Sequence, residues 1–124
     1  MAAGSSDVAF RLLLHPKSWW LIVPFDLGGR ANLAMVLDTG APLSGISAGS
    51  RNALADRGLL HPVGRNRYLL RELSIEGQPV RDLVVRLSRR ATAAGAEGIL
   101  GLDFLSQFTE VHCHTRSLWL TLRR

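Results

Sequence analysis

The stretch from Ala34 to Ala41, with the sequence AMVLDTGA, constrains the fold more than any other part of this chain. Its apolar first half predicts a buried strand, and Asp38, Thr39 and Gly40 then predict a tight turn. Apolar surroundings raise the cost of ionising a carboxyl group, and a glycine at the turn lets a second backbone approach closely. Asp38 is therefore a candidate functional group, and the sequence contains one such turn.

The chain is short enough for a single domain. Its 124 residues, of which 47% are hydrophobic, can build one modest core. We expect residues 1–7 to form a flexible N-terminal segment and residues 8–124 to form the domain. The longest apolar run, from Trp19 to Phe25, is interrupted by Pro24, whereas a membrane-spanning helix needs about 20 apolar residues. The expectation is a soluble domain without a membrane span, either on its own or as part of a longer protein.

The formal charge of +5 comes from arginines that are scattered along the chain. Because they do not gather into one stripe with interleaved aromatic residues, we interpret them as a solvated basic surface and expect no nucleic-acid partner. A basic β-barrel that binds nucleic acid remains an alternative. The single cysteine excludes an internal disulfide and is compatible with a reducing compartment, so the cytoplasm is the expected location.

Short apolar segments bounded by glycine, proline and asparagine predict a mostly β chain. The expected strands, in chain order, are residues 19–27, 31–37, 45–47, 68–75, 80–87 and 118–122, with turns at 28–29 and 76–79 and a projecting hairpin at 62–68. Residues 89–98 predict a polar loop. One short helix is expected over 51–59, capped by Ser50, and a second over 102–108 with Leu102, Leu105 and Phe108 on one face.

The one cluster of metal-ligating residue types is His112, Cys113 and His114. On a strand the two histidines share one face and Cys113 takes the other, so the three cannot converge on one ion without a bulge. We therefore expect no metal. The same geometry argues against a nucleophilic pair of cysteine and histidine.

Three segments of the chain together resemble the retropepsin-like aspartic proteases. They are Leu37-Asp38-Thr39-Gly40-Ala41, the nearby Ser44 and Ile46, and Gly98-Ile99-Leu100-Gly101-Leu102-Asp103-Phe104-Leu105 further along. An Asp-Thr-Gly tripeptide alone is also an ordinary turn sequence, but the apolar lead-in and the downstream Ile-Leu-Gly segment make the pattern more specific. The resemblance covers nearly the whole chain.

The chain departs from the retroviral members of this family. Pro42 and Leu102 stand where retroviral enzymes carry an aspartate and an arginine that form an ion pair. The candidate flap, residues 63–68, has one glycine, Gly64, and two arginines, whereas retroviral flaps are long and rich in glycine. The pattern is therefore closer to the cellular and bacterial members, and a basic flap would favour acidic side chains in the substrate.

The resemblance implies a retropepsin-like acid protease fold, a small closed β-barrel with one or two short helices, assembled as a symmetric homodimer. Peptide hydrolysis by this route needs two carboxyl groups that share a proton, one activating a water and the other protonating the carbonyl oxygen. One chain supplies only Asp38, so a two-fold dimer must bring Asp38 of both subunits together. The implied function is an aspartic endopeptidase that acts on peptides or proteins, without a metal or an organic cofactor.

The resemblance also implies roles for the residues around Asp38. Thr39 matches the hydroxyl that links the two catalytic loops across the dimer, and Gly40 matches the carbonyl that contacts the substrate backbone. Ala41 lacks the hydroxyl found at this place in pepsin-like relatives, which implies a mildly acidic optimum. Ser44 matches a later serine that either hydrogen-bonds near the pair of carboxyl groups or satisfies a turn.

Further substrate contacts are implied for Gly64 and Arg65 in the candidate flap and for Ile99, whose segment passes beneath the catalytic loop; core packing is the other interpretation of Ile99. The segments 19–23 and 118–122 are the expected dimer-forming strands, unless they only complete the sheet of one chain.

The other aspartates are weaker candidates than Asp38 for a catalytic group. We interpret Asp26 and Asp82 as surface residues and Asp103 as a first-turn acid of the second helix. The main alternative function is a catalytically inactive dimer of the same fold that binds a peptide or a partner protein without cutting it.

Overall fold

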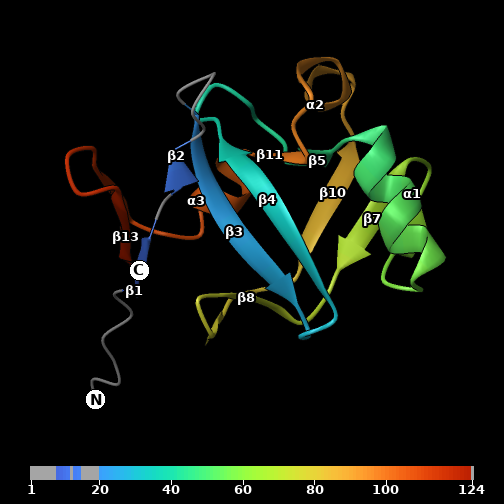
Figure 1. The fold of residues 1–124 in the computed structure, drawn as a ribbon, viewed down its shortest axis with the longest axis horizontal. Coiled ribbons are helices and arrows are strands. Elements are labelled where there is room, and N and C mark those ends of the chain that lie inside the picture. The colour runs from blue at the N-terminus through green and yellow to red at the C-terminus, as the bar shows by residue number, and fades with distance from the viewer. Residues whose placement is uncertain (1–7, 12, 15–19, 124) are drawn as a thin grey trace.

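The computed structural model describes residues 8–11, 13–14 and 20–123, and the segment 1–7 expected to be flexible lies outside these residues. In the described part of the chain, thirteen strands and three short helices follow one another (Figure 1). The expectation of a mostly β fold is confirmed. None of the helices in these ranges has the length and apolar character needed to cross a membrane.

Ten strands form the main sheet, which curls around the core (Figure 1). They are β2 (Leu13–Leu14), β3 (Leu21–Leu27), β4 (Ala31–Leu37), β5 (Gly45–Ile46), β6 (His61–Gly64), β7 (Arg67–Leu70), β8 (Leu73–Ile75), β9 (Gln78–Pro79), β10 (Leu83–Leu87) and β11 (Gly98–Leu100). Their order is β6-β7-β10-β5-β11-β4-β3-β8-β9, and β2 also pairs with β3.

The hairpin of β3 and β4 forms where the sequence predicts it. Gly28 and Gly29 have φ angles of 58° and 72°, a conformation that glycine adopts without strain. The apolar residues of both strands alternate, so Phe25 on β3 and Met35 on β4 point into the core. The strand β4 ends at Leu37 and delivers Asp38 directly after it.

Two very short strands hold the centre of the sheet together. Leu100 on β11 lies opposite Leu37 in a parallel pair, and Ile99 lies opposite Gly45 of β5 in an antiparallel pair. The strand β5 then pairs in parallel with β10. The end of β4 is thereby fixed to segments that are far away in the sequence.

Two of the longer strands expected from the sequence differ from the strands that form, and one of them is divided in two. The segment 68–75 contains β7 and β8, separated at Glu72, whose φ angle is 57°. The segment 80–87 corresponds to β10, with β9 preceding it inside the expected turn. Because the chain turns at Glu72, β7 pairs with β10, whereas β8 pairs with β3 and β9. The two halves of the segment 68–75 therefore belong to different parts of the sheet.

A second, three-stranded sheet consists of β1 (Val8–Arg11), β12 (Glu110–His114) and β13 (Trp119–Arg123), in the order β1-β13-β12. The strand β13 is therefore in the middle, so residues 118–122 complete a sheet within the same chain, which is the alternative that the sequence left open for them. The other expected dimer strand, 19–23, falls partly outside the described residues. Its described part belongs to β3, which pairs with β2, β4 and β8 of the same chain.

The helix α1 (Ala48–Asp56) begins three residues before the expected start. Its cap is Ser47 rather than Ser50, because the Ser47 Oγ accepts the backbone N–H of Ser50 at 3.1 Å. Ser50 itself lies in the first turn.

The helix α2 (Arg89–Ala94) occupies the segment expected to be a loop. The Ser88 Oγ caps it by accepting the Ala91 N–H at 3.0 Å, and Gly95 ends it with a φ of 73°. Arginine and alanine are good helix formers, and the helix is too short to show an apolar stripe in the sequence.

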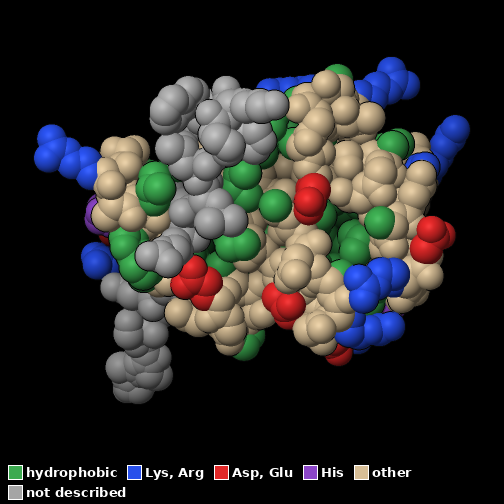
Figure 2. Space-filling model, in the orientation of Figure 1, with side chains coloured by type: hydrophobic (Ala, Val, Ile, Leu, Met, Phe, Trp, Pro, Cys, Tyr) green, Lys and Arg blue, Asp and Glu red, His purple; other side chains and the backbone are tan. Residues whose placement is uncertain are grey.

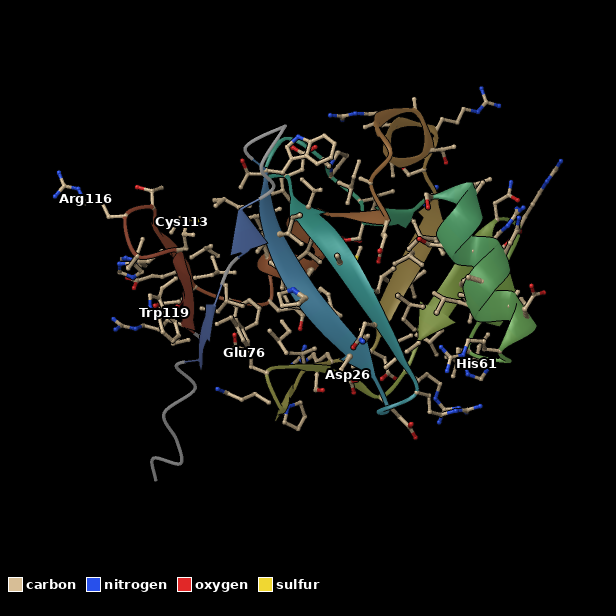
Figure 3. The ribbon with its side chains drawn as sticks, viewed as in Figure 1. Asp26, His61, Glu76, Cys113, Arg116 and Trp119 are labelled. Carbon is tan, nitrogen blue, oxygen red and sulfur yellow. The ribbon has the colours of Figure 1, made fainter. Side chains whose placement is uncertain are left out.

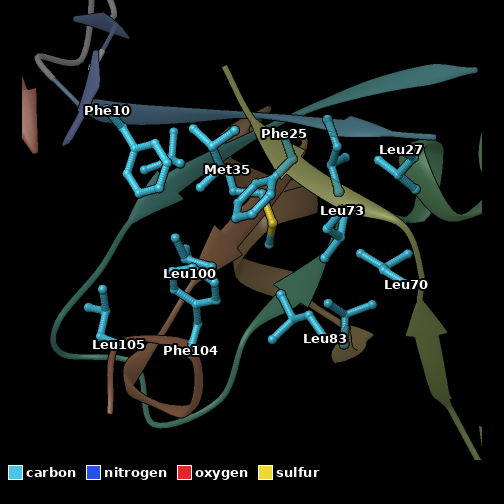
Figure 4. Packing of buried hydrophobic residues seen from close by; sticks show 14 of the residues in the cluster. Phe10, Phe25, Leu27, Met35, Leu70, Leu73, Leu83, Leu100, Phe104 and Leu105 are labelled. Carbon is cyan, nitrogen blue, oxygen red and sulfur yellow. The ribbon is translucent and has the colours of Figure 1, made fainter. Parts of the chain in front are cut away.

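The helix α3 (Leu102–Leu105) is shorter than expected. Phe104 and Leu105 are buried, as is Phe108 just beyond the helix, but Leu102 is 46% exposed and does not belong to the buried stripe. The Phe104 ring packs edge-on against Phe25 at a centroid distance of 5.7 Å (Figure 4). The core therefore lies between the curled sheet and α3.

Candidate active site

Asp38 lies on a short loop at the end of β4, with its side chain 24% exposed. Its backbone N–H donates to the Leu100 carbonyl at 3.0 Å, and its own carbonyl accepts the Ala41 N–H at 3.1 Å. The Gly40 N–H donates to the Asp38 Oδ1 at 2.9 Å. These bonds fix the direction of the carboxylate, while Thr39 and Gly40 remain exposed on the loop.

The backbone at Gly101 supports this loop from below. A Cβ atom at Gly101 would lie 2.6 Å from the Ala41 carbonyl oxygen and 3.0 Å from the backbone carbon of Leu43. The next residue, Leu102, donates its N–H to the same Ala41 carbonyl at 2.9 Å. Since no side chain fits, this position requires glycine, and the loop rests directly on the start of α3.

Ser44 joins the loop to α3 through a buried hydroxyl group. Ser44 is 1% exposed, and its Oγ donates to the Asp103 Oδ1 at 2.6 Å and accepts the Gly101 N–H at 2.9 Å. The Asp103 Oδ2 accepts the Ser44 N–H at 2.9 Å. Ser44 thus contacts Gly101 and Asp103 rather than Asp38. Of the two roles expected for Ser44, these hydrogen bonds correspond to the one that holds the loop in place.

Asp103 is more than the first-turn acid expected from the sequence. It does lie in the first turn of α3, where its Oδ1 also accepts the Phe104 N–H at 2.9 Å. Its carboxylate clamps the loop at Asp38 to the helix through Ser44. Sequence analysis missed this connection because the two residues are 59 positions apart and no local pattern relates them.

Arg90 on α2 forms an ion pair with Asp38 that sequence analysis also missed. The distance from its Nη2 to the Asp38 Oδ2 is 3.2 Å, and the arginine side chain is 74% exposed. The contact depends on α2, which was expected to be a loop. The serine that precedes Arg89 and Arg90 is the sequence signal that could have indicated a capped helix here.

A small cavity of about 90 Å³ lies beside this ion pair, between α2 and the ends of β4 and β11. Its wall is mainly apolar, and Asp38 and Arg90 contribute the charged groups. The apolar lining residues are Trp20, Val36, Ala91, Ala94, Ala96 and Ile99. Ile99, an expected substrate contact, is thus placed next to Asp38.

The candidate flap is the hairpin of β6 and β7, which confirms a hairpin at this position. Arg67 on β7 lies opposite Arg86, and Arg86 lies opposite Gly45, in the row of the sheet that leads through Ile99 to Val36, two residues before Asp38. The tip with Gly64 and Arg65 is therefore at the same end of the sheet as Asp38. It is four interstrand steps away, about 19 Å along the sheet.

The other candidate acids lie elsewhere. Asp26 accepts the Gly29 N–H at 2.7 Å in the β3–β4 turn, and Asp82 is exposed. Asp26 and Glu76 lie at the opposite end of the sheet from α2 (Figures 1 and 3). They border a larger, shallow hollow of about 610 Å³ on the outer face of β3, β4 and β8, which does not include Asp38.

Cys113 and the neighbouring histidines lie on the small sheet, away from Asp38 (Figure 3). The rings of His112 and His114 stack at a centroid distance of 6.4 Å. Partial loss of solvent raises the pKa of the Cys113 thiol, which makes it a poor nucleophile at neutral pH. Among the residues that the structure describes, no three histidine, cysteine or acidic side chains are grouped to hold a metal ion.

Basic side chains lie mostly toward the rim of the face seen in Figure 2, and acidic ones are dispersed over its middle and its edges. This view shows no basic stripe on that face. The expectation that the chain has no nucleic-acid partner stays a prediction.

No model of a known protein family matches the sequence, and no curated protein matches it either. Solved structures do match the fold. A retropepsin-like aspartic protease from Rickettsia conorii aligns with a TM-score of 0.62 at 14% identity, over 94% of this chain and 90% of that one. The retroviral protease-like domain of Ddi1 from Leishmania major aligns with a TM-score of 0.55 at 17% identity, over 83% of this chain and 87% of that one. Together with the strand order and the loop at Asp38, these likenesses show that the chain has a retropepsin-like fold.

Proposed function

We propose that this protein is an aspartic endopeptidase that acts as a homodimer, with Asp38 of each subunit as the catalytic pair. The observation that supports the proposal most directly is the position of Asp38. Asp38 directly follows the end of β4, on a loop held by Leu100, Ser44 and Gly101, in a retropepsin-like fold. Such fixed support keeps a catalytic group oriented without reorganisation during the reaction.

In this mechanism the two carboxyl groups share one proton. The ionised group takes a proton from a water molecule, whose oxygen attacks the carbonyl carbon of the substrate, and the protonated group donates its proton to the carbonyl oxygen. The tetrahedral intermediate then breaks: one of its hydroxyl groups returns a proton to the carboxylate that had donated one, the C–N bond cleaves, and the leaving nitrogen receives the proton taken from the water. The Gly40 N–H holds the Asp38 Oδ1 throughout.

The surrounding residues have supporting roles in the proposal. Thr39 is exposed at the tip of the loop, where its hydroxyl group can reach the partner subunit. The exposed backbone of Gly40 is available to the substrate. Ile99 lies at the wall of the cavity beside Asp38, and Gly64 and Arg65 belong to the hairpin that would cover a bound peptide. Ala41 is buried and completes the loop.

One observation favours the alternative of a dimer that binds peptides without cutting them. In the single chain the Asp38 carboxylate is paired with Arg90 rather than with a second carboxyl group. If that ion pair persisted in the dimer, the site would retain a groove but lack a proton to donate.

The test is the substitution Asp38→Asn, with Asp82→Asn as a matched acid-to-amide control on the surface. Because Asn cannot act as a base or a proton donor, we expect Asp38→Asn to lower the cleavage rate of a peptide library by about a hundred-fold or more, while Asp82→Asn cleaves like wild type. Cleavage is read by mass spectrometry of the products. Cutting by Asp38→Asn at the wild-type rate would show that Asp38 is not the catalyst.

A tandem fusion of two copies tests the pair directly. One copy carries Asp38→Asn and the other is wild type, so each molecule has a single Asp38. The proposal expects this fusion to be as inactive as the doubly substituted one, because both carboxyl groups take part in each turnover. If all variants bind peptides but even the wild-type fusion does not cleave them, the binding-only alternative is correct.

A further inference from the structure

Arg90 lines the cavity beside the proposed catalytic carboxylate. Its Nη2 is 3.2 Å from the Asp38 Oδ2, and the side chain is 74% exposed. A guanidinium carries five N–H donors in a planar fork. Within the described residues its recorded contact is to one oxygen of Asp38, so donors remain for a second carboxylate.

The backbone that carries Arg90 is held in place from several directions. The Ser88 Oγ accepts the Ala91 N–H at 3.0 Å, and Ala91 is fully buried. On the other side of the helix, the Thr92 Oγ1 accepts the Ala48 N–H of α1 at 3.0 Å. The position of Arg90 relative to the site is therefore fixed, whereas its long side chain lies in solvent and can turn from Asp38 toward a ligand.

The volume and the lining of the cavity together favour a small ligand group with a negative charge. Its volume of about 90 Å³ and its wall of alanine, valine, isoleucine and tryptophan side chains suit a short aliphatic stem. A carboxylate at the end of such a stem would meet Arg90, which contributes to the wall of the cavity. Arginine and carboxylate can form two parallel hydrogen bonds, which are stronger than neutral ones. A lysine in the same place would meet a like charge.

We propose that Arg90 is a specificity-determining residue that favours substrates with a glutamate or aspartate directly beside the scissile bond. This inference rests on the proposed endopeptidase function, and it assigns the preference to α2 rather than to the arginines of the candidate flap. The apolar wall alone would instead favour a small uncharged side chain. Comparing glutamate with glutamine separates the two, because these residues have the same shape and differ in charge.

The experiment uses four peptides that differ only at the residue beside the scissile bond, which is Glu, Gln, Ala or Lys. For the wild-type protein we expect kcat/KM to be about ten-fold higher for the Glu peptide than for the Gln peptide. This factor corresponds to the free energy of one charge-assisted hydrogen-bonded pair between Arg90 and the glutamate of the substrate. Arg90→Ala should bring this ratio to about one, and Arg90→Glu should make the Lys peptide the best substrate. Arg89→Ala, which removes the preceding arginine of the same helix, should keep the wild-type ratio.

Equal cleavage of the Glu and Gln peptides by wild type would overturn the inference, as would a Glu preference that survives Arg90→Ala. A preference for the Ala peptide would show that the apolar wall decides. A binding measurement separates this inference from the proposed function. Fluorescence anisotropy measures the affinity of the Glu and Gln peptides for two variants, Asp38→Asn alone and Asp38→Asn combined with Arg90→Ala. The quantity compared is the ratio of the two peptide affinities in each variant. That ratio decides the role of Arg90 even if Asp38 proves not to be catalytic.

Discussion

At the scale of single residues, the loop that carries Asp38 depends on groups that do not touch Asp38. The Ser44 hydroxyl group is buried between the Gly101 N–H and the Asp103 carboxylate. Ser44 was identified from its place after the Asp-Thr-Gly turn and Asp103 from its place at a helix start. Neither local sequence pattern predicts the hydrogen bond between them, which forms because the start of α3 passes beneath the loop at Asp38.

Ser44→Ala should destabilise the protein by about 2–3 kcal/mol, because it leaves the buried Gly101 N–H without a partner and removes one of the two hydrogen bonds that the Asp103 Oδ1 accepts. The measurement is urea unfolding at neutral pH. Ser106→Ala is the matched control: Ser106 is exposed, its Oγ makes one long bond of 3.4 Å to the Asp103 carbonyl, and its loss should cost about 0.5 kcal/mol or less. Equal unfolding midpoints for the two variants would contradict the clamp described for Ser44.

At the scale of elements, the sequence predicted the structures that local residue patterns specify. It did not predict the structures that depend on tertiary contacts. The hairpin of β3 and β4 was predicted with its turn because alternating apolar residues and Gly28-Gly29 specify it locally. The helix α2 was not predicted because residues 89–94 have no apolar stripe. It forms through the cap at Ser88 and the packing of Thr92 and Ala91 against α1 and β5.

Whether a strand lies at an edge is another property that sequence does not show. Residues 118–122 alternate like an edge strand, and the strand itself was predicted. Its neighbour β1 comes from the other end of the chain, and the pairing of Phe10 with Leu120 is invisible in either segment alone. The position of Arg90 at Asp38 was unpredictable for the same reason, since it follows from the placement of a helix.

Ser88→Ala should weaken α2 specifically. Loss of the cap costs about 1 kcal/mol and lets the first turn of the helix fray, so the Glu to Gln preference expected from Arg90 should decrease. The control is Ser47→Ala, which removes the equivalent cap from α1 at a similar cost in stability but leaves α2 capped. Peptide cleavage and thermal unfolding of both variants provide the comparison. A loss of preference in Ser47→Ala as large as in Ser88→Ala would show that general destabilisation is responsible.

At the scale of the whole molecule, one chain supplies one Asp38, so the proposed chemistry is a property of an assembly. A two-fold axis next to the loop would bring the same residues of both chains together. The exposed Thr39 and Gly40 are the part of the loop available for that contact.

Cleavage per chain should therefore fall as the protein is diluted below the dissociation constant of the dimer. A tandem fusion of two wild-type copies should keep its activity over the same range, because the linker holds the second copy at a high effective concentration. Rate per chain is compared with molar mass at each concentration. A constant rate for samples that are monomeric by mass would exclude the shared pair of carboxyl groups.

The antiparallel pairing of β1 with β13 also has a mechanical consequence. Val8 lies opposite Leu122 and Arg11 lies opposite Trp119, so the outer ends of the two strands are side by side at one end of the small sheet. A pulling force applied through these two ends would load their hydrogen bonds one after another, as in opening a zipper, rather than all at once in shear. The small sheet would then peel open under a weak load, while the strands that carry Asp38 lie outside the path of the force.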